Sequence, residues 1–250
     1  MRQRLPRRGW YHNDVHSGAV FGVHGTLYAV LVAFVIFLSF QSFASARQYA
    51  AEEAIAVTAM HREAGLFEPA DWNAVRGQLR CYATAVVNDD WPAMAEGETS
   101  DTVEDWLVAL DQTVGTTTIN GAKQATLFGN WLDQSSERRE GRRGRLTEAA
   151  PFVPGPLWVV LLFGGALVVG NVVVFSTRRE RAVGQVVTIT TLTAMVVACL
   201  LVIQFLDRPF ADRVGSIRPT EMLRTLELMD RVEPEEAQPP CDSDGMPRSG

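Results

Sequence analysis

Three long apolar runs alternate with charged segments along the chain. The first run, 19–43, contains no Asp, Glu, Lys or Arg, and about 20 apolar residues suffice to cross the hydrocarbon core of a bilayer. The second run covers 157–176 and the third covers 183–206. The pattern therefore predicts three transmembrane helices. The last two form a hairpin, because only the short basic segment 178–181 separates them.

The first span is expected to continue as a helix beyond the membrane, to about residue 66. No glycine or proline interrupts the sequence between Gly25 and Gly65. A cleaved signal peptide is the alternative, since Ala44-Ser45-Ala46 after a basic start and an apolar core resembles a cleavage site. The helical pattern runs straight through that site, which favours a retained helix.

The region 44–156, between the first and second spans, has helical periodicity throughout. Apolar residues recur at spacings of three and four over 72–86 and 103–114, and a further helix is expected over 117–131. Asp71 and Asp101 are plausible N-caps for the first two of these helices.

The first of these helices is expected to end at Asp89-Asp90-Trp91-Pro92. The two aspartates are interpreted as solvated helix-end charges, with acid–base chemistry or cation binding as the alternative. Residues 137–145, rich in arginine and glycine, are interpreted as a solvated linker, with binding of an anion or lipid headgroup as the alternative.

The predicted fold class is therefore all-α: a helical membrane protein with three transmembrane helices and a long helical insertion between the first and second. A basic segment, 1–18, precedes the first span. An amphipathic helix is expected within 207–232, and the acidic, proline-rich end 233–250 is expected to be disordered.

The charged residues indicate how the chain is oriented in the membrane, whereas the charges and the cysteines together indicate no catalytic or metal-binding chemistry. Basic residues in 2–8 and 178–181 place the N-terminus and the hairpin loop in the cytoplasm and 44–156 outside, although the arginines of 138–145 oppose this assignment. The basic clusters lack interleaved aromatic residues, so no nucleic-acid partner is expected. Cys81, Cys199 and Cys241 are interpreted as ordinary thiols. No metal-ligand spacing and no cofactor motif is present.

Small and polar residues inside the spans are the candidate sites. Small residues that let helices approach closely in lipid are Gly18, Gly22, Gly25, Ala29 and Ala33 in the first span and Gly164, Gly165 and Gly170 in the second. Residues that could line a pore or carry an intramembrane polar group are His24, Phe34, Phe37, Phe40, Asn171, Thr188, Thr191 and Gln204. For each of them, ordinary packing or a hydrogen bond to a neighbouring helix is the alternative.

A series of short motifs runs along the chain, and its residues, in order, are His12, Asn13, Asp14, Tyr82, Trp91, Pro92, Arg142, Arg145, Asp207, Arg208, Pro209 and Phe210. The motifs and their order resemble an uncharacterised bacterial membrane family with a bestrophin-like domain. The resemblance covers about 12–230 and implies a bacterial inner-membrane, multi-pass protein. Members usually carry a further span before the His-Asn-Asp motif, whereas this chain starts within the loop that precedes the motif.

The family resemblance implies kinship with bestrophins, which are homopentameric anion channels whose long middle region is cytosolic. That location is opposite to the one that the charges favour here. The first functional hypothesis is therefore an oligomeric anion channel or transport protein in the lipid bilayer. The alternative is a non-catalytic scaffold or regulatory subunit that binds a protein partner through 44–156. An enzyme is not predicted, because the chain contains no HExxH, GxSxG or phosphate-binding glycine loop.

Overall fold

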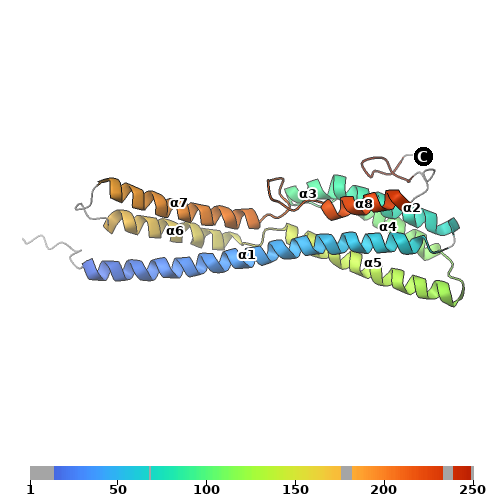
Figure 1. Ribbon diagram of the computed structural model, residues 1–250, viewed down its shortest axis with the longest axis horizontal. Helices are drawn as coiled ribbons and strands as arrows, with labels where there is room; N and C mark the ends of the chain where they lie inside the picture. Colours follow the sequence, from blue (N-terminus) through green and yellow to red (C-terminus); the bar gives the residue numbers. More distant parts are fainter. Residues whose placement is uncertain (1–13, 68, 176–181, 233–238, 249–250) are drawn as a thin grey trace, which may run out of the picture. The chain divides into compact units, whose positions relative to one another are not determined.

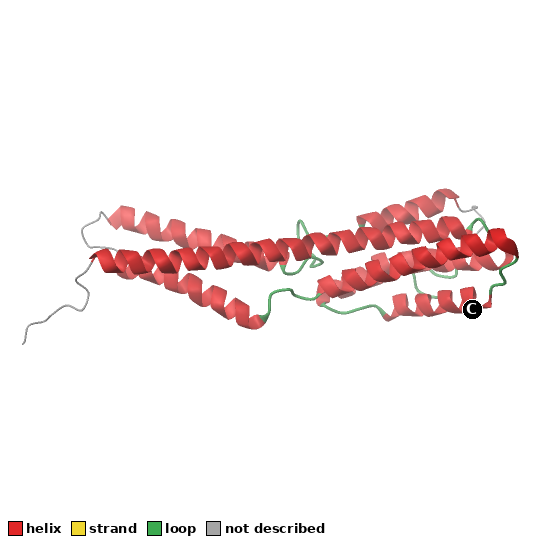
Figure 2. Ribbon diagram, turned by 90° about the horizontal axis from the view of Figure 1, so that it is seen from below, coloured by secondary structure: helices red, strands yellow, loops and turns green. Residues whose placement is uncertain are grey.

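The computed structural model describes residues 14–67, 69–175, 182–232 and 239–248, and every regular element in these ranges is a helix (Figure 1). The longest helix, α1, runs over Asp14–Ala64 without a break. Helices α6 (Gly155–Phe175) and α7 (Ala182–Leu206) form the second and third spans. All three are long and apolar enough to cross a membrane, which confirms the predicted all-α, three-span fold. Figure 2 shows the same helices and the loops that join them.

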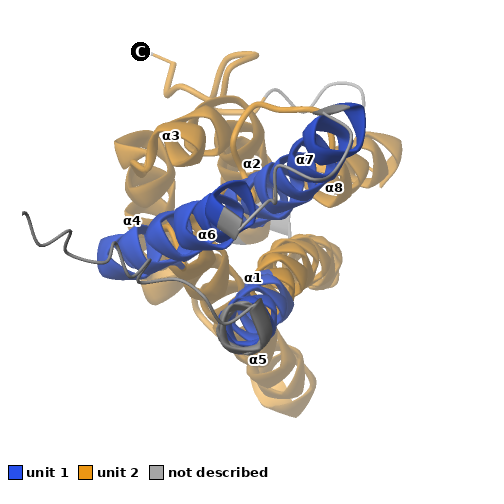
Figure 3. Ribbon diagram, turned by 90° about the vertical axis from the view of Figure 1, so that its left-hand side faces the viewer, with its two compact units in different colours: residues 1–39, 153–206 blue, residues 40–152, 207–250 orange. Residues whose placement is uncertain are grey.

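The chain divides into two compact units, coloured separately in Figure 3. Unit 1 consists of Met1–Ser39 and Val153–Leu206, and unit 2 consists of Phe40–Phe152 and Asp207–Gly250. The helix α1 contributes to both cores, through Val32 and Val35 in unit 1 and through residues such as Val57 in unit 2.

In unit 1, two glycines of α6 pack directly against aromatic and apolar side chains. A methyl group added to Gly164 would lie 2.7 Å from Tyr28 Cδ2. One added to Gly165 would lie 2.9 Å from both the Tyr28 hydroxyl and Val196 Cγ1. Only a residue without a side chain lets these helices come so close, which is the usual role of small residues between helices in lipid.

Unit 2 is a helical bundle made from the second part of α1 and from segments on both sides of the α6–α7 hairpin. Its further helices are α2 (Pro69–Ala85), the π-helical turn η1 (Val86–Asp90), α3 (Trp91–Glu96), α4 (Asp101–Thr116), α5 (Gly121–Ala149) and α8 (Thr220–Val232). The predicted apolar stripes face its core. The buried members of the first stripe are Trp72, Val75, Leu79, Tyr82 and Val86, and those of the second are Val103, Trp106 and Leu110.

The N-terminal ends of two helices differ from the prediction. The N-cap of α4 is Ser100, whose hydroxyl accepts a hydrogen bond from the Val103 amide at 3.2 Å, so Asp101 is the first helical residue. Helix α2 begins at Pro69, where the missing N–H of proline costs nothing, and Asp71 lies inside its first turn.

The predicted helix end at Asp89–Pro92 is wrong, because the chain stays helical from Pro69 to Glu96. Proline inside an α-helix lacks a donor, and its ring collides with the carbonyl four residues earlier. The wider turn η1 directly precedes Trp91 and Pro92, and inserting one extra residue is a common way to relieve such a conflict.

The predicted linker at 137–145 is also wrong, since these residues lie within the 29-residue helix α5. Two glycines of this segment sit against α1: a methyl group at Gly141 would lie 2.7 Å from the Glu53 amide nitrogen, and one at Gly144 would overlap the Tyr49 ring. These glycines permit close contact between two helices, although their sequence context suggested a flexible segment.

The C-terminal segment is folded over residues 239–248, which corrects the expectation of disorder for this part of 233–250; residues 233–238 and 249–250 lie outside the described ranges. Cys241 forms a disulfide with Cys81 of α2, so these two cysteines are not free thiols, whereas Cys199 is free. Two hydrogen bonds add to the disulfide: Trp106 Nε1 donates to the Gly245 carbonyl at 2.6 Å and Asn88 Nδ2 donates to the Ser243 carbonyl at 3.1 Å.

Candidate functional site: a buried arginine–carboxylate network

A stripe of mostly polar residues on α5 faces the core of unit 2. Its members lie four, three, four and three positions apart, which places them on one side of a helix. They are Trp131, Ser135, Arg138, Arg142 and Arg145, and all are buried. Buried arginines require acceptors, and other helices of unit 2 supply most of them.

Arg145 joins two carboxylates from different helices. Its Nε lies 2.5 Å from Glu53 Oε2 on α1, and its Nη2 lies 3.1 Å from Glu53 Oε1 and 2.8 Å from Asp90 Oδ2 on η1. The side chains of all three residues are fully buried. Arg145 Nη1 donates to Met94 Sδ at 3.0 Å, which occupies the remaining edge of the guanidinium. Bidentate pairing of an arginine with a carboxylate, as between Arg145 and Glu53, is among the strongest polar contacts in proteins.

Arg142 extends the network towards the surface. Its Nη1 lies 2.8 Å from Asp90 Oδ2, and its Nη2 lies 2.8 Å from Glu104 Oε1 on α4. The Asp90 carboxylate also accepts the Ser100 amide at 3.0 Å. Asp90 is 0% exposed, so its interpretation as a solvated helix-end charge is wrong. Because η1 is a wider turn than an α-helix, it helps to determine which of the two adjacent aspartates faces inward.

Aromatic side chains enclose the charged groups. The Tyr82 hydroxyl donates to Glu53 Oε1. Arg145 Cζ lies 5.2 Å from the centre of the Trp91 ring, within the range of a cation–π contact. Trp91 in turn meets Phe210 edge-on at 5.4 Å and donates from Nε1 to the Ile217 carbonyl at 3.1 Å. The segment that follows α7 is thereby attached to the network.

The surroundings of Asp90, Arg142 and Arg145 shift the pKa of each towards its ionised state. Burial alone would raise the pKa of Asp90, but Arg145, Arg142 and the Ser100 amide outweigh that effect and hold the pKa below its ordinary value. Burial lowers the pKa of Arg145, and the attraction of Glu53 and Asp90 reverses the shift, so this pKa lies above its usual range. Burial and the neighbouring Glu53 carboxylate both raise the pKa of Tyr82, which remains a neutral donor.

The arrangement is suited to holding helices together rather than to catalysis. Each carboxylate at its centre is already occupied by arginines, and its central side chains are closed to solvent. Among the residues that the structure describes, no group of three or more His, Cys, Asp and Glu side chains could bind a metal ion.

Motif residues that are far apart in the sequence meet in this network. They are Tyr82, Trp91, Arg142, Arg145 and Phe210. Among their motif neighbours, Asp207 and Pro209 are buried, whereas Pro92 and Arg208 are exposed. His12 and Asn13 lie outside the described residues, and Asp14 is the first residue of α1.

A family model for the bestrophin-like domain matches residues 1–222. The chain belongs to the bestrophin-like family. No curated protein matches the sequence.

Solved structures similar to this bestrophin-like chain include a bacterial bestrophin homologue from Klebsiella pneumoniae. The structure of this homologue solved by zinc phasing has 15% sequence identity to the present chain and a TM-score of 0.67. The match covers 86% of the present chain and 88% of the homologue. Two point variants of the homologue give the same TM-score: one is 15% identical over 84% and 85% of the two chains, and the other is 16% identical over 88% and 87%. At this level of identity, the likeness shows the fold.

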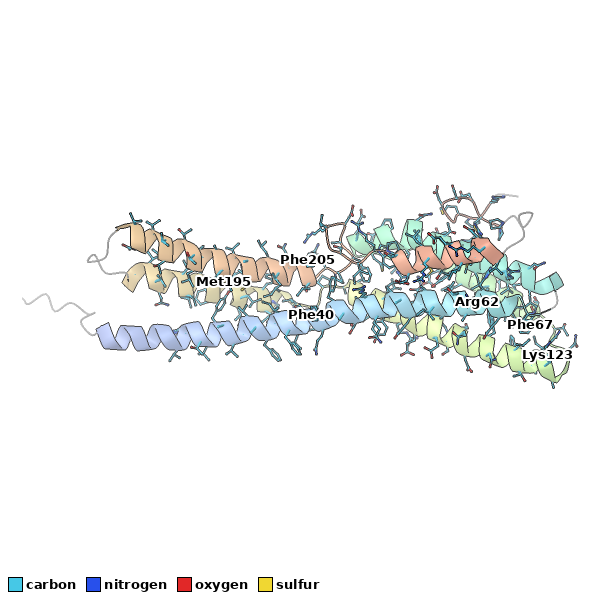
Figure 4. All side chains as sticks on the ribbon, viewed as in Figure 1. Phe40, Arg62, Phe67, Lys123, Met195 and Phe205 are labelled. Atoms are coloured by element: carbon cyan, nitrogen blue, oxygen red, sulfur yellow. A yellow bond between two sulfur atoms is a disulfide. The ribbon has the colours of Figure 1, made fainter. Side chains whose placement is uncertain are left out.

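The candidate residues in the spans of the bestrophin-like chain are scattered rather than gathered into one site. Gly22 and Gly25 on α1 and Gly170 on α6 face open space, and Ala29 and Ala33 are exposed, so none of these small residues is covered by another described helix; Gly18 lies in α1. Phe34, Phe37 and Phe40 are 59%, 56% and 58% exposed. Figure 4 labels Phe40 on α1 and Met195 on α7 among the exposed apolar side chains.

The polar candidates of the spans point outward or bond within their own helix. His24, Thr191 and Gln204 are exposed. Asn171 Nδ2 donates to the Leu167 carbonyl at 2.8 Å, and Thr188 Oγ1 donates to the Gly184 carbonyl at 3.0 Å. Such bonds to the preceding turn satisfy a polar side chain in lipid without a second helix.

Glu53 and Asp90, the acceptors of the network, were not identified from the sequence as a pair. Glu53 belongs to a segment rich in alanine and glutamate that looks solvated. The available signal was the spacing of the arginines on α5, because a buried arginine requires a carboxylate elsewhere.

We predict that Arg145→Met strongly destabilises unit 2, because the change leaves Glu53 buried without its cation and weakens the pairing of Asp90. The expected loss is about 3–5 kcal/mol of unfolding free energy. It is measured by thermal or denaturant unfolding in detergent. Arg143→Met, at an exposed position two residues away, is the control and should change stability by about 0.5 kcal/mol at most. Equal effects of the two changes would contradict a central role for the network.

The lowered pKa of Asp90 predicts a specific dependence of stability on pH. A carboxylate with a lowered pKa contributes stability above its unfolded pKa of about 3.9, and this contribution is lost as the pH falls through its folded pKa. Asp90→Asn should therefore be less stable than the unmodified protein at pH 7, and the difference should narrow below about pH 4. Unfolding curves at several pH values test this prediction, with the exposed Asp105→Asn as control. A difference that stays constant with pH would refute it.

Proposed function

We propose that the protein is a homo-oligomeric anion channel in which copies of α1 surround the conduction pathway. Membership of the bestrophin-like family and the fold shared with a bacterial bestrophin homologue support this function. Bestrophins are homopentameric anion channels, so the same activity is the first one to test here. The single observation on this chain that carries the proposal is an unusual apolar face on α1.

That face has the spacing of a helix–helix seam. Large apolar residues recur at intervals of four, three, four and three, and they are 56–65% exposed: Val23, Leu27, Val30, Phe34 and Phe37. Such a repeat is typical of helices that pack lengthwise against one another. Lipid alone would not demand it.

Small residues directly precede three of these large ones. Gly22 stands before Val23, Ala29 before Val30 and Ala33 before Phe34. Small residues allow the backbone of a neighbouring helix to approach closely in lipid. The space beside Gly22 and Gly25 is open in the single chain, so it is free to receive a second copy.

In a ring of α1 copies that meet along this face, Phe34 and Phe37 would form a hydrophobic constriction where the contact between copies borders the pathway. Rings of apolar side chains can block ion flow by excluding water from a narrow passage. Shortening one of these side chains would then widen the passage.

We expect purified protein in lipid vesicles to release chloride, and we expect Phe37→Ala to increase the rate. The measurement is chloride efflux after the external anion is replaced with gluconate. Leu162→Ala, at an apolar α6 position that is 56% exposed, is the matched control and should leave the rate unchanged. Absence of chloride flux across pH, voltage and calcium concentration, or a monomeric particle in mild detergent, would overturn the proposal.

We also propose that unit 2 lies outside the cytoplasm of a bacterial inner membrane. Basic residues precede the first span and fill the α6–α7 connection, as expected for cytoplasmic segments. With three spans, unit 2 then lies on the opposite side. The disulfide between Cys81 and Cys241 supports this orientation independently, because structural disulfides persist in oxidising compartments and are rare in the cytosol.

Thiol labelling in bacterial cells with a permeabilised outer membrane tests this orientation. Cys81 and Cys241 are buried, so the reporter is a cysteine introduced by Glu98→Cys at an exposed position of unit 2. An impermeant maleimide should modify this cysteine before lysis. A cysteine introduced into the hairpin loop by Ser176→Cys is the control and should be modified only after lysis. Modification of the Glu98→Cys variant only after lysis would place unit 2 in the cytoplasm.

A further inference from the structure

Arg138 is the one arginine of the α5 stripe that has no carboxylate partner among the described residues. It is 2% exposed, and its Cζ lies 5.3 Å from the centre of the Tyr82 ring. The Nε and Nη1 atoms of Arg138 are buried, and neither has a hydrogen-bond acceptor within the described ranges. Trp131 Nε1, two turns earlier on the same face, is a further buried donor without an acceptor.

Arg142 and Arg145 take every carboxylate of the network. Glu53 pairs with Arg145, and Asp90 pairs with both arginines. The third carboxylate, on Glu104, has a side chain that is 59% exposed and pairs with Arg142. Arg138 is therefore left without a carboxylate partner among the described residues.

Arginine keeps its donors and its charge in proteins, unlike a buried lysine or histidine. Leaving buried donors of a charged group without an acceptor is costly, and an aromatic face compensates only part of the cost. The Nε and Nη1 donors of Arg138 thus lack an acceptor in the part of the chain that the structure describes.

We propose that unit 2 binds a small monovalent anion, such as chloride, at Arg138 Nε and Nη1. A halide suits this position because it accepts hydrogen bonds from several directions and donates none. It would accept hydrogen bonds from both free donors of Arg138, and its single charge costs less to bury than the two charges of a divalent anion. The site lies in the core of unit 2 and does not rest on the proposed channel activity.

Stability in different salts tests the site with the complete chain in detergent. The protein is dialysed into sodium gluconate, and sodium chloride is substituted at constant ionic strength. The unfolding temperature should rise with chloride concentration. Above the dissociation constant the rise should follow the logarithm of the concentration, as for a ligand that binds only the folded state. Bromide should act like chloride, and sulfate at the same ionic strength should not.

Two matched variants separate the site from general salt effects. Arg138→Met should abolish the chloride response, and in gluconate it should be at least as stable as the unmodified protein, because an apolar side chain replaces an unpaired buried charge. Arg139→Met, at the exposed neighbouring position, should keep the full response. Equal stability of the unmodified protein in chloride and gluconate, or a full response in Arg138→Met, would overturn the proposal.

Crystals grown in bromide give a second reading that does not depend on a variant. An anomalous bromine peak within hydrogen-bonding distance of Arg138 Nη1 is expected, and its absence at full bromide substitution would count against the site. Chloride flux through vesicles is a separate measurement. Chloride flux without a halide-dependent unfolding temperature would refute only the buried site. A halide-dependent unfolding temperature without chloride flux would refute only the channel.

Discussion

Unit 2 depends on the pairing of the Arg145 guanidinium with the carboxylates of Glu53 and Asp90. Three separate stretches of chain meet at this point: the extension of the first span, the π-helical turn and the long helix α5. Removing charges from water costs desolvation free energy, and only close, bidentate ion pairs with further hydrogen bonds offset that cost. These stretches therefore cannot shift past one another without leaving a charge buried and alone, so the network specifies one arrangement of the helices.

The architecture follows readily from the sequence because it depends on the contrast between lipid and water. Spans of hydrocarbon length and the absence of helix breakers after Gly25 suffice to predict three spans and a long first helix. The apolar stripes of α2 and α4 are likewise visible as residues three and four apart. In each case the side chains that point inward are the ones that avoid water.

The network is hidden from the same reasoning because its inward-pointing side chains are charged. The stripe on α5 has helical spacing, but Arg138, Arg142 and Arg145 would be assigned to a solvated face by their chemistry. Glycines at positions 141 and 144 reinforced that error, since a glycine-rich basic segment looks flexible when its packing partners are unknown. The Cys81–Cys241 pair was missed for a related reason: a sequence separation of 160 residues gives no local sign of contact.

The same disulfide has a consequence for how the chain is assembled. One cysteine precedes both spans of the α6–α7 hairpin and the other follows them, so the covalent loop contains the entire hairpin. The loop can close only when both cysteines are on the same side of a bilayer, so a hairpin in which only one of the two helices has crossed cannot form the disulfide. A single cut anywhere between the two cysteines would leave the fragments of the oxidised molecule covalently joined.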